Sequence, residues 1–270
     1  MTTDRPVTVH DLAALRARGE RIVMVTAYDA NAAALADEAG VPVLLVGDSL
    51  AMVVLGHPTT LPVTLDEMLH HARAVVRGAG RALVVVDLPF GSTQGGPADA
   101  LASGVRVLKE TGAAAVKLEG GRAAAPSVRA LTGAGIPVMG HVGLTPQSVH
   151  VLGGYRVQGR GDGAAEELVA DVLALADAGA FAVVLEAVPA PVAAAVTSAS
   201  PVPIIGIGAG PDVDGQVLVW HDVLGLTPGP HPRFVRAYDD LRGRTVAALR
   251  AFAADVASGE YPGPAQTYGA

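Results

Sequence analysis

The chain has no cysteine among its 270 residues, and only 4% of them are aromatic. Without cysteine, the protein has neither a disulfide framework nor a thiolate that acts as a nucleophile or as a metal ligand. The absence of disulfides suits a cytoplasmic protein, and this is the location that we expect.

Long apolar segments are also missing. Half of the residues are hydrophobic, but charge, glycine or proline interrupts every apolar run well before the roughly 18 residues that a membrane span needs. Residues 1–21 are polar and helix-like, without the apolar core of a signal peptide. The sequence therefore predicts neither a membrane span nor a membrane partner.

Clusters of basic residues are absent as well. The formal net charge is −7, and no stretch of Lys and Arg interleaves with aromatic residues. Because nucleic-acid binding requires clustered positive charge to neutralise phosphates, we expect no nucleic-acid partner. Only 17% of the residues are charged, which leaves room for buried subunit contacts, and we expect a homo-oligomer.

What the sequence does contain is a regular alternation of strand-like and helix-like segments. The expected strands lie near residues 21–26, 42–47, 82–87, 113–119, 136–141, 181–186, 203–207 and 222–226. The expected helices lie between them, at residues 29–39, 64–77, 97–111, 122–134, 163–178 and 189–199. Eight such units predict an α/β fold, a (βα)8 TIM barrel, for which about 250 residues are typical. We expect one catalytic domain over residues 1–270.

Four acidic residues end four of the expected strands. They are Asp48 in VLLVGDS, Asp87 in ALVVVDLP, Glu119 in AAVKLEGG and Glu186 in AVVLEAVP. Continuous Val- and Leu-rich runs are typical of buried parallel strands, whose C-terminal ends meet on the face of a barrel where active sites lie. Each acid alone also fits the cap of a following helix. Four in one chain favour a single acidic site.

The types of residue in this set indicate a magnesium site. Asp48, Asp87 and Glu119 offer hard oxygen ligands, and Mg²⁺ prefers oxygen ligands and keeps some of its water. Zinc would favour His or Cys. Lys117 lies two residues before Glu119, so both side chains face the same side of their strand. A buried lysine requires a carboxylate partner, and Lys117 is therefore either an ion-pair partner or a substrate anchor.

Two further residues are candidates for catalysis. Glu186 has only apolar neighbours in sequence, and such surroundings raise the pKa of a carboxyl group towards the range of a general base. His141 ends the fifth expected strand and is a second candidate for proton transfer, although a single histidine is often structural.

Two connections are too long to be simple turns. They cover residues 49–62 and 143–162, and both follow the C-terminal end of a strand, where long loops serve as lids or binding walls. The second contains Gln147, Arg156, Gln158 and Arg160, so we expect it to contact a ligand. The glycine-rich segment 206–210 lacks the third glycine of a dinucleotide-binding motif and indicates only a tight turn.

The chain resembles the ketopantoate hydroxymethyltransferase (3-methyl-2-oxobutanoate hydroxymethyltransferase) family over nearly its whole length. The resemblance rests on long motifs in the same order: TAYDA (26–30), LLVGDSLAMVVLGHPTTLPVT (44–64), DLPFGS (87–92), VKLEGG (116–121), GHVGLTPQSVHVLGGYRVQGRG (140–161), VLEAVP (184–189), GIGAG (206–210) and DGQVLVWHDVLGL (214–226).

This resemblance implies an Mg²⁺-dependent transfer of a hydroxymethyl group from 5,10-methylenetetrahydrofolate to 3-methyl-2-oxobutanoate, a 2-oxo acid. The product is 2-dehydropantoate, in the first step of pantothenate biosynthesis. Motif matching implies one Mg²⁺ per subunit held by Asp48, Asp87 and Glu119, with Glu186 as proton acceptor. Asp48, Ser49, Asp87 and Lys117 match positions that contact the keto acid. The family also implies a homodecamer of two pentameric rings.

Two other readings remain open at this point. One is a magnesium-dependent lyase that acts on a 2-oxo acid without folate, although related lyases typically use a catalytic cysteine, which this chain lacks. The other is a non-catalytic metabolite-binding protein on the same barrel. An assay of folate-dependent hydroxymethylation separates these readings.

Overall fold

The computed structural model describes residues 5–161 and 163–269. The chain forms two compact units, Met1–Val219 and Trp220–Ala270, and each is described by itself. The prediction that residues 1–270 make up one catalytic domain stays a prediction.

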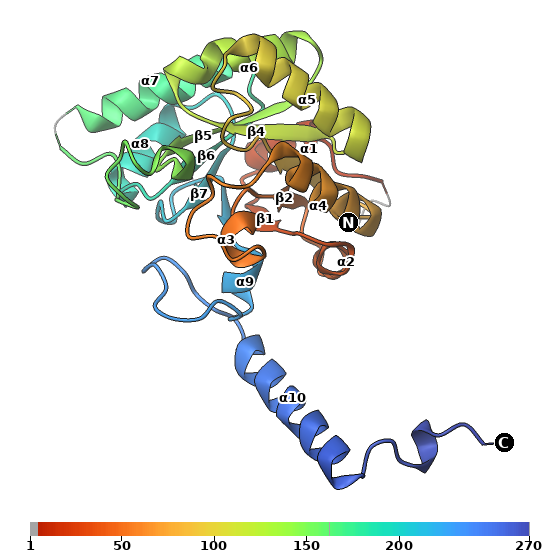
Figure 1. The fold of residues 1–270 in the computed structure, drawn as a ribbon. Helices are drawn as coiled ribbons and strands as arrows, with labels where there is room; N and C mark the ends of the chain where they lie inside the picture. Colours follow the sequence, from red (N-terminus) through yellow and green to blue (C-terminus); the bar gives the residue numbers. More distant parts are fainter. Residues whose placement is uncertain (1–4, 162, 270) are drawn as a thin grey trace. The chain divides into compact units, whose positions relative to one another are not determined.

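The first unit is a closed barrel of eight parallel strands in sequence order, which confirms the predicted (βα)8 fold (Figure 1). Pairing of Met24 in the first strand with Val217 in the last closes the barrel. The strands are β1 (Ile22–Thr26), β2 (Val43–Val46), β3 (Leu83–Asp87), β4 (Ala115–Glu119), β5 (Val138–Gly143), β6 (Ala182–Glu186), β7 (Ile204–Ile207) and β8 (Gly215–Leu218).

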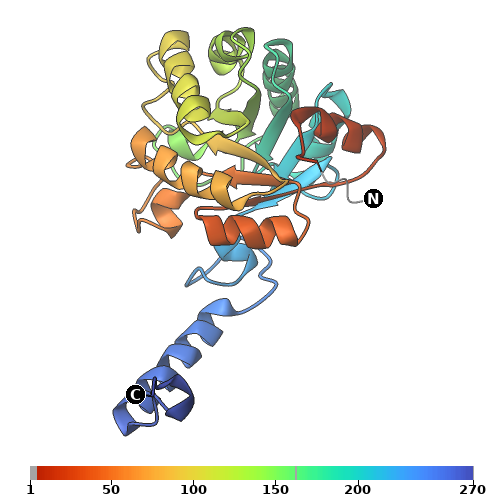
Figure 2. The same cartoon turned by 90° about the vertical axis from the view of Figure 1, so that its right-hand side faces the viewer.

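Helices lie around these strands (Figure 2), and the first of them contributes Leu12 to the core of the barrel. Within the described part of this unit they are α1 (Val9–Ala17), α2 (Ala30–Glu38), α3 (Leu50–Val53), α4 (Leu65–Gly78), α5 (Pro97–Thr111), α6 (Ala125–Gly133), α7 (Ala164–Asp177) and α8 (Ala190–Ala199), with short 3₁₀ turns at Arg122–Ala124 and Pro146–Ser148. The helix predicted at 122–134 is therefore a 3₁₀ turn followed by α6.

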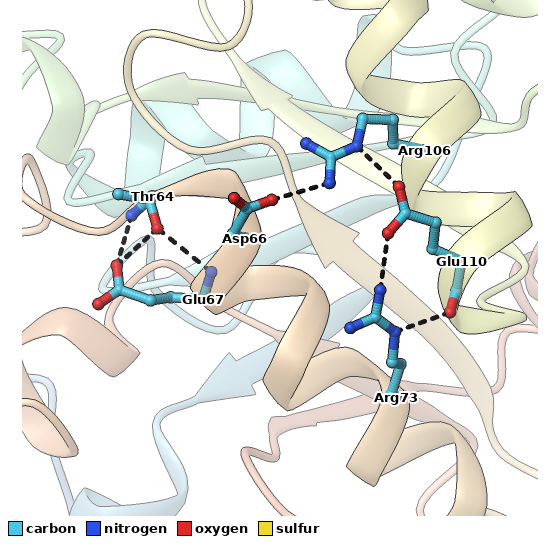
Figure 3. A network of polar contacts seen from close by, with 6 residues as sticks. All are labelled: Thr64, Asp66, Glu67, Arg73, Arg106 and Glu110. Atoms are coloured by element: carbon cyan, nitrogen blue, oxygen red, sulfur yellow. Dashed lines mark hydrogen bonds and ion pairs between the residues drawn. The ribbon is translucent and has the colours of Figure 1, made fainter.

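Local sequence signals set the ends of α4 and α5. Thr64 and Glu67 form a reciprocal capping box at the start of α4, in which the Thr64 hydroxyl accepts from the Glu67 amide and the Glu67 carboxylate accepts from the Thr64 amide (Figure 3). Pro97 begins α5, and Gly112 ends it with a φ of 79° that favours glycine. On the outer surface, Arg106 contacts both Asp66 of α4 and Glu110 of α5 (Figure 3).

The interior of the barrel is filled by alternate residues of the strands. One core cluster contains inward-facing residues of all eight strands, including Met24, Val43, Val85, Ala115 and Met139. These side chains are almost completely buried. Because residues i and i+2 of a strand share a face, the next inward positions of the same strands lie at the C-terminal end of the barrel.

The strand predicted at 222–226 is wrong. The eighth strand is β8, Gly215–Leu218, and residues 220–223 form the short helix α9 (Trp220–Val223). A Cβ on Gly215 would lie 2.4 Å from the Ile22 carbonyl oxygen, so the close approach of β1 requires glycine there. Backbone pairing with β1 and β7 therefore defines this strand, and no long apolar run marks it.

The second unit contains α9, the long helix α10 (Leu241–Ser258) and a 3₁₀ turn at Pro264–Gln266. Asp240 caps the start of α10 by accepting from the Gly243 amide. No residue of α10 is buried, and Leu249 and Phe252 are 62% and 53% exposed. Across the described residues of the chain, no helix has the length and apolar character to span a membrane.

Candidate active site

The strands place the predicted site residues at one end of the barrel. Asp87, Glu119 and Glu186 are the last residues of β3, β4 and β6, and Asp48 lies two residues after β2. Because all strands run parallel, these residues share the C-terminal end with two inward-facing residues of β4 and β5. We call the six together the polar layer: Asp48, Asp87, Lys117, Glu119, His141 and Glu186.

Lys117 is the positive centre of the polar layer. Its Nζ lies 2.8 Å from Asp87 Oδ1 and 3.1 Å from His141 Nδ1, and its side chain is 4% exposed. Burial by itself lowers the pKa of Lys117, but the negative charges of Asp87, Glu119 and Asp48 outweigh it and raise the pKa above its ordinary value. Lys117 is therefore charged, and the predicted ion pair is present.

His141 connects Lys117 to Glu186. Burial, followed by the positive charge of Lys117, holds the pKa of His141 well below its ordinary value, so the ring is neutral. Since the ammonium of Lys117 has only protons to donate, His141 Nδ1 accepts and Nε2 carries the proton. Nε2 lies 3.2 Å from Glu186 Oε2, but it is not aligned for a hydrogen bond.

Glu186 has the environment predicted for a base. Burial raises its pKa to about 7, against the opposing effect of Lys117. The backbone around it is held tightly: a Cβ on Gly143, at a φ of +87°, would lie 2.3 Å from the Glu186 carbonyl oxygen. Ala187, directly after it, has a φ of 49°, which is unfavourable for a residue other than glycine. Such strain is common next to functional groups.

Asp48 and Glu119 repel other carboxylates in the polar layer. Burial and the charge of Asp87 raise the pKa of Asp48 to about 7. Burial and the charge of Asp48 raise the pKa of Glu119 well above its ordinary value. The Asp48 amide donates to Asp87 Oδ2 at 3.0 Å, which ties the two strand ends together. Glu119 Oε1 is buried without a hydrogen-bond partner.

Sequence reasoning missed two contacts of the site. Gln147, in the predicted ligand loop, is 8% exposed and donates from its side chain to Asp48 Oδ2 at 2.9 Å. Tyr28, in the turn after β1, shares a hydrogen bond of 2.9 Å with Ser49. The polar residues Gln147 and Tyr28 each follow a strand end, which is the signal that points to them.

The donor set fits a hard divalent cation. Two observations support this fit. One carboxylate oxygen of Glu119 is buried without a hydrogen bond, and the pKa values of Asp48 and Glu119 are raised, which a nearby cation would reverse. The described residues contain no group of three His, Cys, Asp or Glu side chains that forms a metal shell by itself. The fit is therefore to an ion such as Mg²⁺ that keeps water and takes substrate oxygens.

The closed (βα)8 barrel carries its charged side chains at the C-terminal end, which is where (βα)8-barrel enzymes have their active sites. The family model described as ketopantoate hydroxymethyltransferase matches residues 6–264. The chain belongs to this family, and it is a transferase enzyme.

Individual relatives are similar over most of their length. A 3-methyl-2-oxobutanoate hydroxymethyltransferase of Frankia casuarinae is 61% identical over 97% of this chain and 89% of its own. One of Moorella thermoacetica is 58% identical over 95% of each chain. Among solved structures, a phosphonopyruvate hydrolase in complex with oxalate and Mg²⁺ has a TM-score of 0.62 at 15% identity, covering 96% of this chain and 93% of that one. At this identity the likeness shows the fold alone.

Proposed function

We propose that the protein transfers a hydroxymethyl group from 5,10-methylenetetrahydrofolate to 3-methyl-2-oxobutanoate, giving 2-dehydropantoate, the first step of pantothenate biosynthesis. The observation that carries this proposal is the family match over residues 6–264. The polar layer supports it, because a buried base with a raised pKa lies beside a charged lysine.

Glu186 takes the proton from C3 of the keto acid. Its raised pKa gives it basicity near neutral pH, while burial keeps water away from it. The electron pair of the broken C–H bond moves into the enolate of the substrate. C3 then bonds to the one-carbon unit of the folate, the two C–N bonds to that carbon break, water supplies its hydroxyl group, and tetrahydrofolate leaves with its two nitrogens protonated. Neutral His141 lies beside this base, with Nε2 3.2 Å from Glu186 Oε2, and a small rotation of the ring would let Nε2–H donate to the carboxylate and orient it.

Lys117 and Ser49 bind the carboxylate end of the keto acid. Lys117 offers a fixed positive charge, and Ser49 offers a hydroxyl whose position is set by Tyr28. Asp48, Asp87 and Glu119 would hold one Mg²⁺ per subunit. When bound, the cation supplies positive charge that stabilises the developing charge on the substrate oxygens.

The test is an assay of the purified full chain with 3-methyl-2-oxobutanoate and 5,10-methylenetetrahydrofolate, read by mass spectrometry of the product. We expect 2-dehydropantoate only when both substrates and Mg²⁺ are present, and loss of turnover after chelation. Cleavage of 2-oxo acids without folate would instead support a lyase. Absence of both reactions would support a non-catalytic binding protein.

We also propose that the protein is a cytoplasmic homo-oligomer, with a decamer as the expected form. Large apolar side chains on α10, including Leu249, Phe252 and Val256, are 49–62% exposed, which suits burial against another subunit. Sedimentation equilibrium should give a mass about ten times that of the 27.1 kDa chain. Replacing Leu249 and Phe252 with Ser should lower the mass, and a monomeric wild-type protein would contradict the proposal.

A further inference from the structure

Gln147 links two acids of the polar layer that lie on different strands. Its side-chain amide donates to Asp48 Oδ2 at 2.9 Å, and its backbone amide donates to Glu119 Oε2 at 3.0 Å. Asp48 follows β2, Glu119 ends β4, and Gln147 lies in the 3₁₀ turn after β5. One residue therefore contacts carboxylates from opposite sides of the acidic cluster.

The orientation of this amide is fixed by its two acceptors. Gln147 Nε2 donates to Asp48 Oδ2 and also to the Leu88 carbonyl oxygen at 3.0 Å. Both N–H groups of the amide are used, and a flipped amide would place its oxygen against two other oxygens. With its side chain 8% exposed, Gln147 has little room to adopt another arrangement.

These bonds also decide which oxygens of the acids remain available. Gln147 occupies Oε2 of Glu119, while Oε1 is buried without a hydrogen-bond partner. At Asp48, it occupies Oδ2. An amide that holds one oxygen of each carboxylate sets the direction of the other, as outer hydrogen bonds do for metal ligands in general.

We infer that Gln147 is a positioning residue that orients Asp48 and Glu119 for a divalent cation. The inference rests on the proposed magnesium site and adds to it a residue that does not contact the cation. It also gives a role to the contact of the 3₁₀ turn at Pro146–Ser148 with both acids. Gln147 is neutral, so it orients carboxylates without cancelling the negative charge that attracts the cation.

The test compares divalent-cation binding by variants of the full chain without substrates. Calorimetric titration with MgCl₂ and electron paramagnetic resonance with Mn²⁺ should show affinity reduced about 10–100-fold in Gln147→Ala. Gln147→Glu, similar in size, places one carboxylate oxygen in the position of Nε2, against both Asp48 Oδ2 and Leu88 O. We expect Asp48 to be displaced and the cation site to be similarly weak. Gln216→Ala is the matched control, because Gln216 lies in β8 outside the polar layer and its Nε2 donates to Gly210 O at 2.8 Å.

Thermal unfolding of the metal-free variants separates positioning from a general structural role. A structural role alone would lower the melting temperature of metal-free Gln147→Ala and leave the cation affinity of the folded protein unchanged. That result overturns the inference. If Gln147→Ala does not fold, Gln147→Asn, which keeps the amide but shortens its reach, gives the same comparison. A wild-type protein that binds neither cation would instead overturn the magnesium site of the proposed function.

Discussion

The same strands form the apolar layers of the barrel and the polar layer at its C-terminal end, but different interactions hold the side chains of the two regions. In the apolar layers, Met24, Val85 and Met139 contact apolar neighbours that other side chains of similar volume would satisfy. In the polar layer, Lys117 pairs with Asp87 at 2.8 Å and with His141 at 3.1 Å. Side-chain volume therefore decides which residues fit the apolar layers. In the polar layer, the pairing of charges and the positions of protons decide it.

This difference has an energetic consequence. Burying a charge is unfavourable unless it is paired, so the loss of one partner from the polar layer leaves another charge buried and unpaired. The loss of one apolar side chain leaves a cavity, which weakens the fold but changes no charge. Substitutions in the two regions should therefore affect stability and chemistry in different proportions.

The largest effect is expected from Lys117→Met, which removes the positive charge and keeps the length of the side chain. Asp87 then loses its partner at 2.8 Å, and the keto acid loses its proposed anchor. We expect no measurable turnover and a decrease of about 3–5 kcal/mol in the free energy of unfolding, measured by urea denaturation. The control is Lys109→Met, because Lys109, the only other lysine of the chain, is exposed on α5.

Glu186→Gln tests the chemistry of the polar layer while the shape is kept. Exchange of the C3 proton of 3-methyl-2-oxobutanoate with deuterated water should fall about 10²–10⁴-fold, because the amide cannot accept the proton. Keto acid and Mg²⁺ should still bind. An unchanged exchange rate would show that another group, with His141 as the next candidate, is the base.

Met139→Ala is the matching change in the apolar region. Met139 is fully buried in β5, two residues before His141 and on the same face of the strand. We expect a decrease of about 2–5 kcal/mol in the free energy of unfolding, because the substitution leaves a cavity. Below the unfolding transition, proton exchange should persist, unlike in Glu186→Gln. A complete loss of exchange in the folded variant would break the distinction between the two regions.

The sequence predicts the apolar region better than the polar one. Continuous Val-rich runs such as residues 83–86 indicate buried strands, and their ends indicate where Asp87, Glu119 and Glu186 gather. It does not reveal β8, because backbone pairing around Gly215 defines that strand without an apolar run.

The partners of Gln147 and Tyr28 depend on tertiary structure. Gln147 lies 99 residues after Asp48, and only the folding of the loop after β5 brings its amide to that carboxylate. Tyr28 reaches Ser49 because β1 and β2 are neighbours in the closed barrel. Residue type and spacing indicate that polar residues such as Gln147 lie near the site, but they do not indicate which carboxylate each one contacts.

A smaller effect is expected from pH on the metal-free protein. The pKa of Glu186 is raised from 4.5 to about 7 in the folded protein, so the folded state holds a proton that the unfolded state has released. The associated stability is present below the unfolded pKa and is lost as the pH rises towards 7. We expect a slope of at most about 1.4 kcal/mol per pH unit from this group. Urea denaturation at pH 5, 6 and 7 should show that the free energy of unfolding decreases less with pH in Glu186→Gln than in the wild-type protein. Equal slopes in the two proteins would contradict the raised pKa of Glu186.

The smallest effect concerns the loop between β5 and α7. Its first part is bound to the polar layer through Gln147, and its later part is held by backbone and side-chain contacts, namely Gln158 N to Ala187 O at 2.8 Å and the Tyr155 hydroxyl to Met52 Sδ at 3.7 Å. Residue 162 lies outside the described residues.

We expect keto acid and Mg²⁺ to slow amide exchange in residues 149–161, because a loop at the C-terminal end of a barrel closes over its ligand. Exchange in β5, which the barrel already pairs on both sides, should not change. Mass spectrometry of exchanged peptides with and without ligands measures both segments in one sample. Equal protection of the loop in the two states would mean that it is a fixed wall of the site, and that only the polar layer responds to the substrate.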